Sequence, residues 1–555
     1  MRALADLEVL IVDCQTTGAS PAFGSVLELG WGVARAASGG LTAAEAHWIA
    51  LPDGQRVPRQ VQKITGYEPA HAASALPDRE AWQRLRQAIA RAPAAPTAIH
   101  YARFELAFLR EWSARFEPDA PFPFDAVCVH AIATRLYPDL PRLSLRALAG
   151  YLGHGLELAR RSLGHVEATA FVWCKLCADL ETRGIGTWEQ LQAWLGERPP
   201  PKARSKKPKY PIASERYLSL PDAPGVYRFL RSNGDVLYVG KAASLKKRVT
   251  SHFSARVSKL VAPEMLTQVS EIQVSVVPSA LEAALLENET IKRLRPPYNV
   301  QLTTSETRVW YASRDFAAAS TTADAQFQSG PVASEHSLRP LHALIQLLAG
   351  APITPALRAR AVGISDLWTP DEPVFKLGLA ELIARHPELE TVTVDPGRRA
   401  LQLAKKLLLF PTEDNSAEDA AKPEGWDPAR VARHIESAAA QSYQAYRRAR
   451  FMRLLHDSDI VYREPGGTQA RLLQIRGGEL VASSDVAYEH LPSEPLRPAL
   501  SASGSPLFDR AKYDRLRVLT SELKRIVRDS GQVSVHWAPR RQLPTRLLGG
   551  VLRLV

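Results

Sequence analysis

Residues 225–240 read GVYRFLRSNGDVLYVG, two apolar runs that flank Asn233-Gly234. Asn-Gly between two such runs is the strongest short-range signal of a β-hairpin, because a type I′ turn needs positive φ at both central residues. A two-residue loop pairs Phe229 with Tyr238, and Tyr227 then lies on the same face, diagonal to Tyr238. The pattern predicts a hairpin on which two phenols converge. The plainer alternative is a pair of β-favouring aromatic residues that only pack a sheet.

A helix is predicted directly after the hairpin, over about residues 244–253. Its apolar residues recur every four positions and form a core stripe. Arg248 and His252 are also four residues apart, so they share the adjacent face of this helix. Lys241 follows the strand that presents Tyr238, which places a second cation beside the phenols.

A second helix begins at the capping box Ser279-x-x-Glu282 and runs to about Leu294. Glu287 lies six residues beyond the first core position of this helix, at the flank of its core face. Asn299 follows the helix. Hairpin and helices together predict a small α/β domain over residues 213–302.

These motifs closely resemble the GIY-YIG nuclease domain, in its UvrC and Cho branch. The resemblance rests on five ordered segments: PGVY (224–227), YVGKA (238–242), LKKR (245–248), EAALLE (282–287) and PYNV (297–300). It implies hydrolysis of a DNA phosphodiester with Mg²⁺ or Mn²⁺, one ion being held by Glu287. Position by position, it also implies that Tyr238 helps to activate water with support from Tyr227, that Lys241 and Arg248 sit at the scissile phosphate, and that Asn299 closes the site.

The chemistry of phosphodiester hydrolysis agrees with this allocation, since it needs a metal, cations to offset charge and a base for the water. A single carboxylate indicates one metal ion rather than two. Tyrosine has a usual pKa of about 10, so a neighbouring cation such as Lys241 must favour its ionised form. The UvrC pattern usually has tyrosine where this chain has His252, and the Cho-like branch has histidine there. His252 is also able to bind phosphate or act as a base.

The first segment, residues 1–195, alternates strand-like and helical runs, a pattern typical of an α/β domain. Three stretches resemble the motifs of DEDDh 3′–5′ exonucleases of the polymerase III epsilon type: VLIVDCQTTG (9–18), AIHYARFE (98–105) and LGHVEATA (163–170). The resemblance implies an RNase H-like α/β fold. It also implies a site built from four carboxylates, two metal ions and a histidine.

Two of the four carboxylate positions of that site are lost in this chain. The positions read Asp13, Gln15, Glu105 and Ala170, while His165 is kept. Glutamine offers one neutral oxygen and bridges two hard cations poorly. Glu167 lies one helical turn before Ala170 and offers only partial compensation. We therefore expect a degenerate exonuclease site with little or no exonuclease activity, kept for binding single strands or a 3′ end.

Positive charge is concentrated in the middle of the chain. The 555 residues carry a net charge of +12, and residues 196–302 hold eighteen Lys/Arg against nine Asp/Glu, a net +9. Residues 196–212 form a basic, Pro-rich linker. A localised basic patch favours a nucleic-acid partner, which we take to be DNA.

The remaining residues, 303–555, predict a mixed, mostly helical region with no function that we can assign. Residues 446–453, YRRARFMR, are basic with aromatics, and they either touch DNA or form a solvated helix face. No cysteine follows Cys177, so the iron–sulfur cluster that many relatives carry after the nuclease domain is not expected. Cys174 and Cys177 lie in a helical run and are read as buried helix residues rather than a metal site.

The amino-acid composition indicates which kind of protein this is. Hydrophobic residues make up 45% and charged residues 23% of the chain, which are ordinary globular values. No apolar run is long enough for a membrane span or a signal peptide, and four cysteines are too few for a disulfide scaffold. We therefore expect a cytoplasmic protein without membrane association.

Three hypotheses for the function follow. The first is a Cho-like DNA-repair endonuclease that makes one incision in nucleotide excision repair. This hypothesis implies the UvrA and UvrB damage-recognition proteins as possible partners. The second is an active 3′–5′ exonuclease, and the third is a DNA-binding adaptor without catalysis. The set Tyr238, Lys241, Arg248 and Glu287 favours the first over the third, while Gln15 and Ala170 count against the second.

Overall fold

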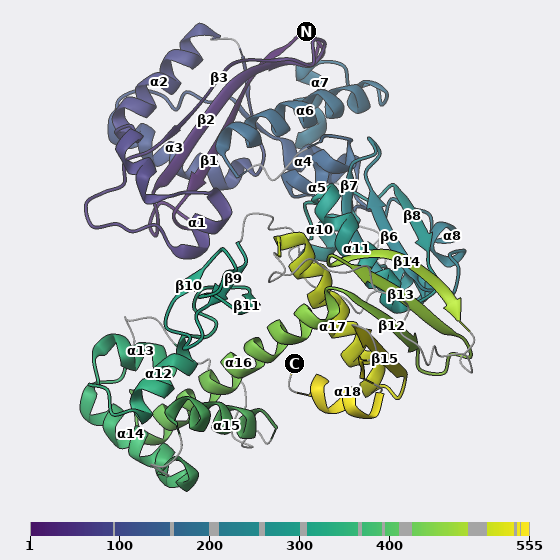
Figure 1. The fold of residues 1–555 in the computed structure, drawn as a ribbon. Helices are drawn as coiled ribbons and strands as arrows, with labels where there is room; N and C mark the ends of the chain where they lie inside the picture. The colour runs from purple at the N-terminus through teal and green to yellow at the C-terminus, as the bar shows by residue number, and fades with distance from the viewer. Residues whose placement is uncertain are drawn as a thin grey trace. The chain divides into compact units, whose positions relative to one another are not determined.

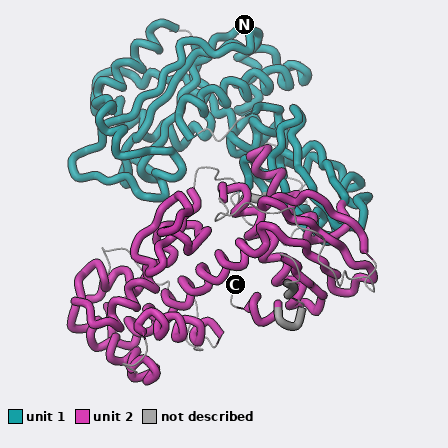
Figure 2. Tube along the Cα trace, viewed as in Figure 1, with its two compact units in different colours: residues 1–276, 296–300 teal, residues 277–295, 301–555 magenta. Residues whose placement is uncertain are grey.

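The computed structural model describes residues 2–92, 95–155, 160–198, 210–254, 261–299, 308–363, 369–390, 395–409, 425–486, 508–537, 541–543, 545–553 and 555. The chain divides into two compact units (Figure 2), residues 1–276 with 296–300 and residues 277–295 with 301–555. Most of the predicted basic linker lies outside the described residues. No helix among the described residues is long and apolar enough to cross a membrane.

The first unit begins with a five-stranded sheet in the order β3-β2-β1-β4-β5. The strands β1, β2 and β3 of this sheet are labelled in Figure 1. β1, β2 and β3 are antiparallel neighbours, whereas β4 runs parallel to β1 and β5 parallel to β4. The strands are β1 (Glu8–Thr16), β2 (Val26–Arg35), β3 (Leu41–Trp48), β4 (Thr97–Ile99) and β5 (Ala126–Cys128). The α/β architecture predicted for this region is confirmed.

Both faces of this sheet are covered by helices, which explains the unbroken apolar run in β1. Val9 and Ile11 belong to one hydrophobic cluster, and Leu10 and Val12 to another, because successive side chains of a strand point to opposite faces. The helices of this region are α1 (Arg59–Thr65), α2 (Asp78–Arg91), α3 (Ala102–Phe116), α4 (Val129–Leu136), α5 (Leu145–Tyr151), α6 (Ser162–Glu181) and α7 (Trp188–Gly196).

The predicted hairpin belongs to a second, smaller sheet in the first unit, in the order β7-β6-β8, with β6 at the centre. Its elements are α8 (Ser214–Leu218), β6 (Gly225–Leu230), β7 (Val236–Ala242), α9 (Leu245–His252), α10 (Val261–Leu266) and β8 (Glu271–Val276). Ser244 caps α9 by accepting a hydrogen bond from the Lys247 backbone N–H. Leu245 and Val249 are fully buried in the hydrophobic cluster of this sheet, as the helical spacing predicted.

The turn of the hairpin differs from the predicted type I′. Gly234 has a φ of +89°, but Asn233 is not among the residues with positive φ, and the Arg231 N–H bonds the carbonyl of Asp235. The loop therefore has three residues with glycine in the left-handed position, the next most common hairpin connection. A register shift between Phe229 and Leu230 compensates for the extra residue, so the predicted pair of Phe229 with Tyr238 is present.

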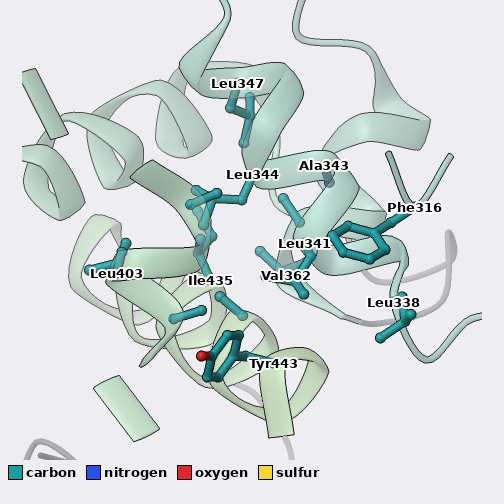
Figure 3. Close-up of a cluster of buried hydrophobic side chains, with 14 of the residues drawn as sticks. Phe316, Leu338, Leu341, Ala343, Leu344, Leu347, Val362, Leu403, Ile435 and Tyr443 are labelled. Atoms are coloured by element: carbon teal, nitrogen blue, oxygen red, sulfur yellow. The ribbon is translucent and has the colours of Figure 1, made fainter. Parts of the chain in front are cut away.

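The second unit contains a group of helices and a further sheet. The helices α12 to α15 and the first part of α16 surround a buried apolar cluster (Figure 3). α11, α17 and the end of α16 cover one face of a five-stranded antiparallel sheet in the order β14-β13-β12-β15-β16, which the sequence pattern did not predict. The elements are α11 (Ala280–Leu294), β9 (Trp310–Ala312), β10 (Ala319–Ser320), β11 (Ser329–Val332), α12 (Arg339–Leu348), α13 (Pro355–Val362), α14 (Glu372–Arg385), α15 (Pro396–Leu409), α16 (Pro428–Leu455), β12 (Ser458–Arg463), β13 (Ala470–Arg476), β14 (Glu479–Val486), α17 (Arg510–Arg528), β15 (Gln532–Trp537), β16 (Arg541–Leu543) and α18 (Thr545–Leu552).

Helix α11 is held in the second unit by polar contacts along its whole length. Ser279 caps the helix and hydrogen-bonds the Tyr462 hydroxyl at 2.7 Å. Glu282 accepts a hydrogen bond from Arg471 Nε at 2.7 Å instead of completing the predicted capping box. Near the other end, Lys292 Nζ lies 2.7 Å from Asp514. The helix predicted to close the GIY-YIG domain is thus packed on the C-terminal sheet.

Candidate nuclease sites

The two tyrosines of the hairpin meet a histidine from helix α9. The ring centroids of Tyr227 and Tyr238 are 6.0 Å apart, and the Tyr227 hydroxyl is hydrogen-bonded to His252 Nε2 at 2.7 Å. The Tyr238 and His252 ring centroids are also 6.0 Å apart. Tyr227 is fully buried, whereas Tyr238 and His252 are half-buried. Of these two phenols, Tyr238 is therefore the one that a ligand reaches from solvent.

Gly240 is the position at which the two phenols leave no room for a side chain. A Cβ atom placed there would lie 2.4 Å from the Tyr227 hydroxyl oxygen and 2.8 Å from Cε1 of Tyr238. Both distances are far below van der Waals contact. The glycine between Val239 and Lys241 is therefore required for the rings to come together on this face.

His252 carries no charge near neutral pH. Burial, together with the positive charge of Arg248, lowers the pKa of His252 from its usual 6.5 to about 4. A neutral imidazole can hold the Tyr227 hydroxyl without adding a cation beside it. The predicted juxtaposition of Arg248 and His252 on α9 is thus present, and it influences the histidine directly.

We predict that replacing His252 by tyrosine will leave the pH dependence of DNA cutting unchanged between about pH 5 and 8, since His252 does not titrate there. Stability should respond differently. The unfolded chain binds the histidine proton more strongly, so the contribution of His252 is present above pH 6.5 and is lost as the pH falls toward 4. Thermal melts should show less acid destabilisation in the variant. An acid loss identical to that of the wild type would contradict the assignment.

The other predicted residues of this site lie on neighbouring elements of the first unit. Lys241 is half-buried at the end of β7, and Arg248 is exposed on α9. The Asn299 side chain makes two hydrogen bonds to Val239, accepting from its N–H and donating to its carbonyl, both at 2.9 Å. Asn299 thereby braces β7 at the residue between Tyr238 and Gly240.

Glu287 lies on α11, in the second unit, and its side chain is half-buried. The donor chemistry of one half-buried carboxylate fits one Mg²⁺ ion, because Mg²⁺ commonly takes one or two carboxylates together with waters and substrate phosphates. Within the described ranges, no group of three or more His, Cys, Asp or Glu could hold a metal. A single ion that shares its ligands with a phosphate is the arrangement this residue can support.

The residues of the exonuclease-like motifs converge beside β1. His165 Nδ1 lies 3.1 Å from Asp13 Oδ1, and Glu105 accepts a hydrogen bond from the Cys14 N–H at 3.1 Å. The Gln15 amide donates to the carbonyl of Arg160. Asp13, Gln15 and Glu105 are all more than 90% buried. The order of the motifs in the sequence therefore predicted that these four side chains lie close together.

The chemistry of this second cluster does not fit two metal ions. Burial, then the charge of Asp13, raises the pKa of Glu105 well above its usual value. Ala170 is buried in the apolar cluster behind the sheet, whereas Glu167 is exposed. Glu167 therefore does not share the environment of the missing carboxylate. With Gln15 and Ala170 at two of the four motif positions, Asp13 and Glu105 are the only acids left at those positions, which is too little negative charge for two divalent cations.

We predict that Glu105→Gln will raise the thermal stability of the protein at neutral and alkaline pH. A carboxyl with a raised folded pKa stabilises the fold fully below its unfolded pKa of 4.5, and this contribution is lost as the pH rises through the folded value. Glutamine keeps an acceptor for the Cys14 N–H and does not titrate. The matched control is Glu111→Gln, an exposed position on α3. A lower melting temperature for the Glu105 variant at neutral pH would contradict this account.

A polar cluster that the sequence did not reveal connects helix α5 of the exonuclease-like region with helix α10 and Tyr298. Glu264 accepts hydrogen bonds from the Tyr298 hydroxyl at 2.9 Å and from Ser144 Oγ at 3.1 Å. The Arg146 guanidinium lies 4.3 Å above the Tyr298 ring. Burial raises the pKa of Tyr298, which favours the donor role of its hydroxyl. Ser144 and Glu264 are 120 residues apart in the sequence, so no local sequence pattern predicts their contact.

A second missed group lies beside the exonuclease-like residues. The fully buried Glu28 accepts hydrogen bonds from Arg161 Nε at 2.5 Å and from the Ser162 N–H at 2.9 Å. Burial raises the pKa of Glu28, although both of these partners oppose the shift. An acidic residue inside the apolar strand of residues 26–35 was the only available sequence signal.

Comparisons with known proteins match the segment that contains the hairpin. Residues 223–300 match the family described as the UvrC-like GIY-YIG domain. UvrABC system protein C of Alkalilimnicola ehrlichii is 50% identical over 92 residues, which are 17% of this chain and 15% of that protein. A putative bifunctional exonuclease/endonuclease protein of Mycobacterium tuberculosis is 28% identical over 306 residues, 54% of this chain and 45% of that protein.

A solved structure is also similar to part of this chain. The GIY-YIG N-terminal endonuclease domain of UvrC from Thermotoga maritima, bound to magnesium, is 34% identical and covers 16% of this chain and 93% of that domain, with a TM-score of 0.15.

Residues 223–300 are thus a nuclease-type domain of the GIY-YIG class. More specifically, they form a UvrC-like GIY-YIG domain, and an exonuclease-like region precedes it in the chain. The matched segments span 15% and 45% of the length of the two curated relatives.

Proposed function

We propose that this protein is a metal-dependent DNA endonuclease of the UvrC and Cho type, which makes one incision in nucleotide excision repair through residues 213–302. The observation that carries the proposal is the convergence of Tyr227, Tyr238 and His252 inside the segment that matches the UvrC-like GIY-YIG domain. The relatives named UvrABC system protein C add UvrA and UvrB to the proposed partners. The net positive charge of residues 196–302 supports DNA as the substrate.

In this proposal each residue of the hairpin site has a separate task. Mg²⁺ bound at Glu287 would supply Lewis-acid polarisation of the phosphate. The half-buried Tyr238 takes part in proton transfer from the attacking water, and the buried Tyr227, hydrogen-bonded to neutral His252, fixes the position of its ring. The cations of Lys241 and Arg248 bind the scissile phosphate and offset its charge.

Asn299 has a supporting task in the same scheme. Its two hydrogen bonds to Val239 keep β7 straight beside Tyr238 and Lys241. The Glu264 cluster lies one residue away, at Tyr298, and ties this end of the domain to α5 of the exonuclease-like region. We therefore propose that the exonuclease-like region steadies the incision site as well as binding DNA.

We also propose that the exonuclease-like region is catalytically inactive and retains a role in binding single strands or a 3′ end. The absence of carboxylates at Gln15 and Ala170 supports this proposal. The second candidate function, an active 3′–5′ exonuclease, is favoured by the retained pair of Asp13 and His165 and by the name of the Mycobacterium tuberculosis relative, a putative bifunctional exonuclease/endonuclease protein.

We predict that Asp13→Asn will leave DNA incision by the full-length protein within about twofold of the wild type, because an inactive site contributes nothing to the rate. The assay uses 3′-tailed DNA with Mg²⁺ and, in parallel, Mn²⁺. Neither protein should shorten the tail. Stepwise loss of nucleotides from the 3′ end by the wild type, absent in the Asp13 variant, would establish the exonuclease reading instead.

The proposed endonuclease is tested by the cutting of end-labelled duplex and nicked DNA by the full-length protein with Mg²⁺ and with a chelator. The proposal expects internal cuts with Mg²⁺ only. Cutting at the same rate in excess chelator would contradict it.

A further inference from the structure

The second unit contains a cavity of about 970 Å³ that lies outside both nuclease sites. Its walls come from the loops around β9 to β11, from the start of α15 and from the middle of α16. The residues that decide its character are three cations, Arg314, Arg398 and Lys405, and the aromatic ring of Tyr446. The volume is at the upper end of the roughly 300–1,000 Å³ that ligand pockets occupy.

The three cations of the cavity are exposed and unpaired. None of their side chains has a hydrogen-bond or ion-pair partner within the described part of the chain. The neighbouring cations of α15 behave differently: Lys406 pairs with Glu388 at 2.7 Å, and Arg399 donates to the backbone carbonyls of Leu348 and Leu389. The unpaired cations of helix α15 therefore line the cavity, whereas its other two cations are bonded to acceptors outside the cavity.

The two acids in the cavity wall, Asp315 and Asp395, form no ion pair with these three cations and leave the wall a net charge of +1. Asp315 accepts hydrogen bonds from Ser313 Oγ at 2.6 Å and from the Ala317 N–H at 3.2 Å. Asp395 accepts from the Arg398 backbone N–H at 3.0 Å. Both carboxylates are thus engaged by local donors. The cavity keeps a net positive wall that attracts an anionic ligand.

Tyr446 offers a supported aromatic surface beside the cations. Its ring centroid lies 5.5 Å from that of Phe316 and 6.3 Å from that of Tyr443. Phe316 and Tyr443 are themselves anchored in the buried cluster of Figure 3, whereas Tyr446 is half-buried. Two buried rings therefore hold in place a third that solvent can reach, and the Arg450 guanidinium lies over this third ring at 5.8 Å from its centroid.

We propose that this cavity binds a segment of single-stranded nucleic acid, with its phosphates at Arg314, Arg398 and Lys405 and an unstacked base against Tyr446. Unpaired cations along a backbone track and an aromatic surface for a base are the two components of single-strand binding sites. A duplex keeps its bases stacked, so its base faces cannot reach a ring recessed in a cavity wall. The site goes beyond the proposed incision and does not depend on it.

The test measures binding of a fluorescein-labelled oligothymidylate to the full-length protein by anisotropy, with chelator present so that no cutting occurs. The triple variant Arg314→Ala/Arg398→Ala/Lys405→Ala should bind at least ~10-fold more weakly. Its slope of log K against log salt should be shallower by about 2, because each single-strand phosphate contact contributes roughly 0.7. The matched control, Arg360→Ala/Lys376→Ala/Lys406→Ala, removes three exposed cations of the same unit that do not line the cavity.

A second arm tests the aromatic contact. The wild type should prefer oligothymidylate to an abasic strand of equal length, Tyr446→Phe should keep this preference, and Tyr446→Ala should lose it. Equal weakening by the cavity triple and the control triple would overturn the proposal, because it would reduce the effect to net charge. Duplex DNA that competes as well as single-stranded DNA for the same cations would overturn it too.

Discussion

Glu287→Gln should lower the rate of Mg²⁺-dependent DNA incision by about 1,000-fold or more, equivalent to ~4 kcal/mol of lost transition-state stabilisation. In our proposal Glu287 is the only carboxylate that holds the metal ion. Glutamine has almost the same size but carries no charge, so it binds a hard divalent cation far more weakly. DNA binding should persist, because the cations that contact the phosphates are unchanged. Single-turnover cutting and anisotropy binding measure the two effects separately.

The matched control for this experiment is Glu289→Gln, which removes the same charge from an exposed position two residues further along α11. It should cut like the wild type. A Glu287 variant that retains cutting within tenfold of the wild type would remove Glu287 from the site and leave the metal without its proposed ligand.

Gly240→Ala should destroy the hairpin site without unfolding the domain. The added Cβ would lie 2.4 Å from the Tyr227 hydroxyl oxygen and 2.8 Å from a ring carbon of Tyr238, so at least one phenol must move. Overpacking of this kind costs about 1–3 kcal/mol of stability. A displacement of about 1 Å at a catalytic group costs roughly 100-fold in rate, which is the loss that we expect in cutting.

Gly234→Ala controls for the loss of stability alone. Gly234 has a φ of +89° in the hairpin loop, and nothing lies within 4 Å of a Cβ there. Alanine in this left-handed conformation costs roughly 1–2 kcal/mol, comparable with the Gly240 variant. Cutting should stay near the wild-type rate at a temperature at which both variants are folded. Equal loss of cutting in the two variants would show that stability, not ring placement, is responsible.

Local sequence patterns predicted the hairpin and the side chains that its strands and helix α9 bring together. The pairing of Phe229 with Tyr238 follows from alternation in two strands around Asn233-Gly234, and Arg248 meets His252 because helical spacing places them together. The turn type was wrong, since Gly234 alone takes positive φ and a register shift absorbs the extra loop residue. Strand pairing tolerates such a shift when core contacts fix the register further along.

The same local patterns could not predict contacts between residues that are far apart in the sequence. The capping signal at Ser279 placed the start of α11 correctly, but nothing nearby in sequence indicates that Tyr462 and Arg471 hold this helix on the C-terminal sheet. The cluster of Glu264 likewise depends on residues more than a hundred positions away. For the exonuclease-like motifs, their order along the chain was enough to predict that Asp13 and His165 meet. This order did not indicate that Glu28 is buried beside them and bonded to Arg161.

The central claim is that cutting comes from the GIY-YIG domain and not from the exonuclease-like region. It is tested most directly by comparing the products of wild type, Glu287→Gln and Asp13→Asn on one DNA labelled at its 5′ end, with Mg²⁺. We expect a defined internal product from the wild type and from Asp13→Asn, and none from Glu287→Gln. A ladder of products shortened from the 3′ end, abolished by Asp13→Asn and retained by Glu287→Gln, would contradict the account.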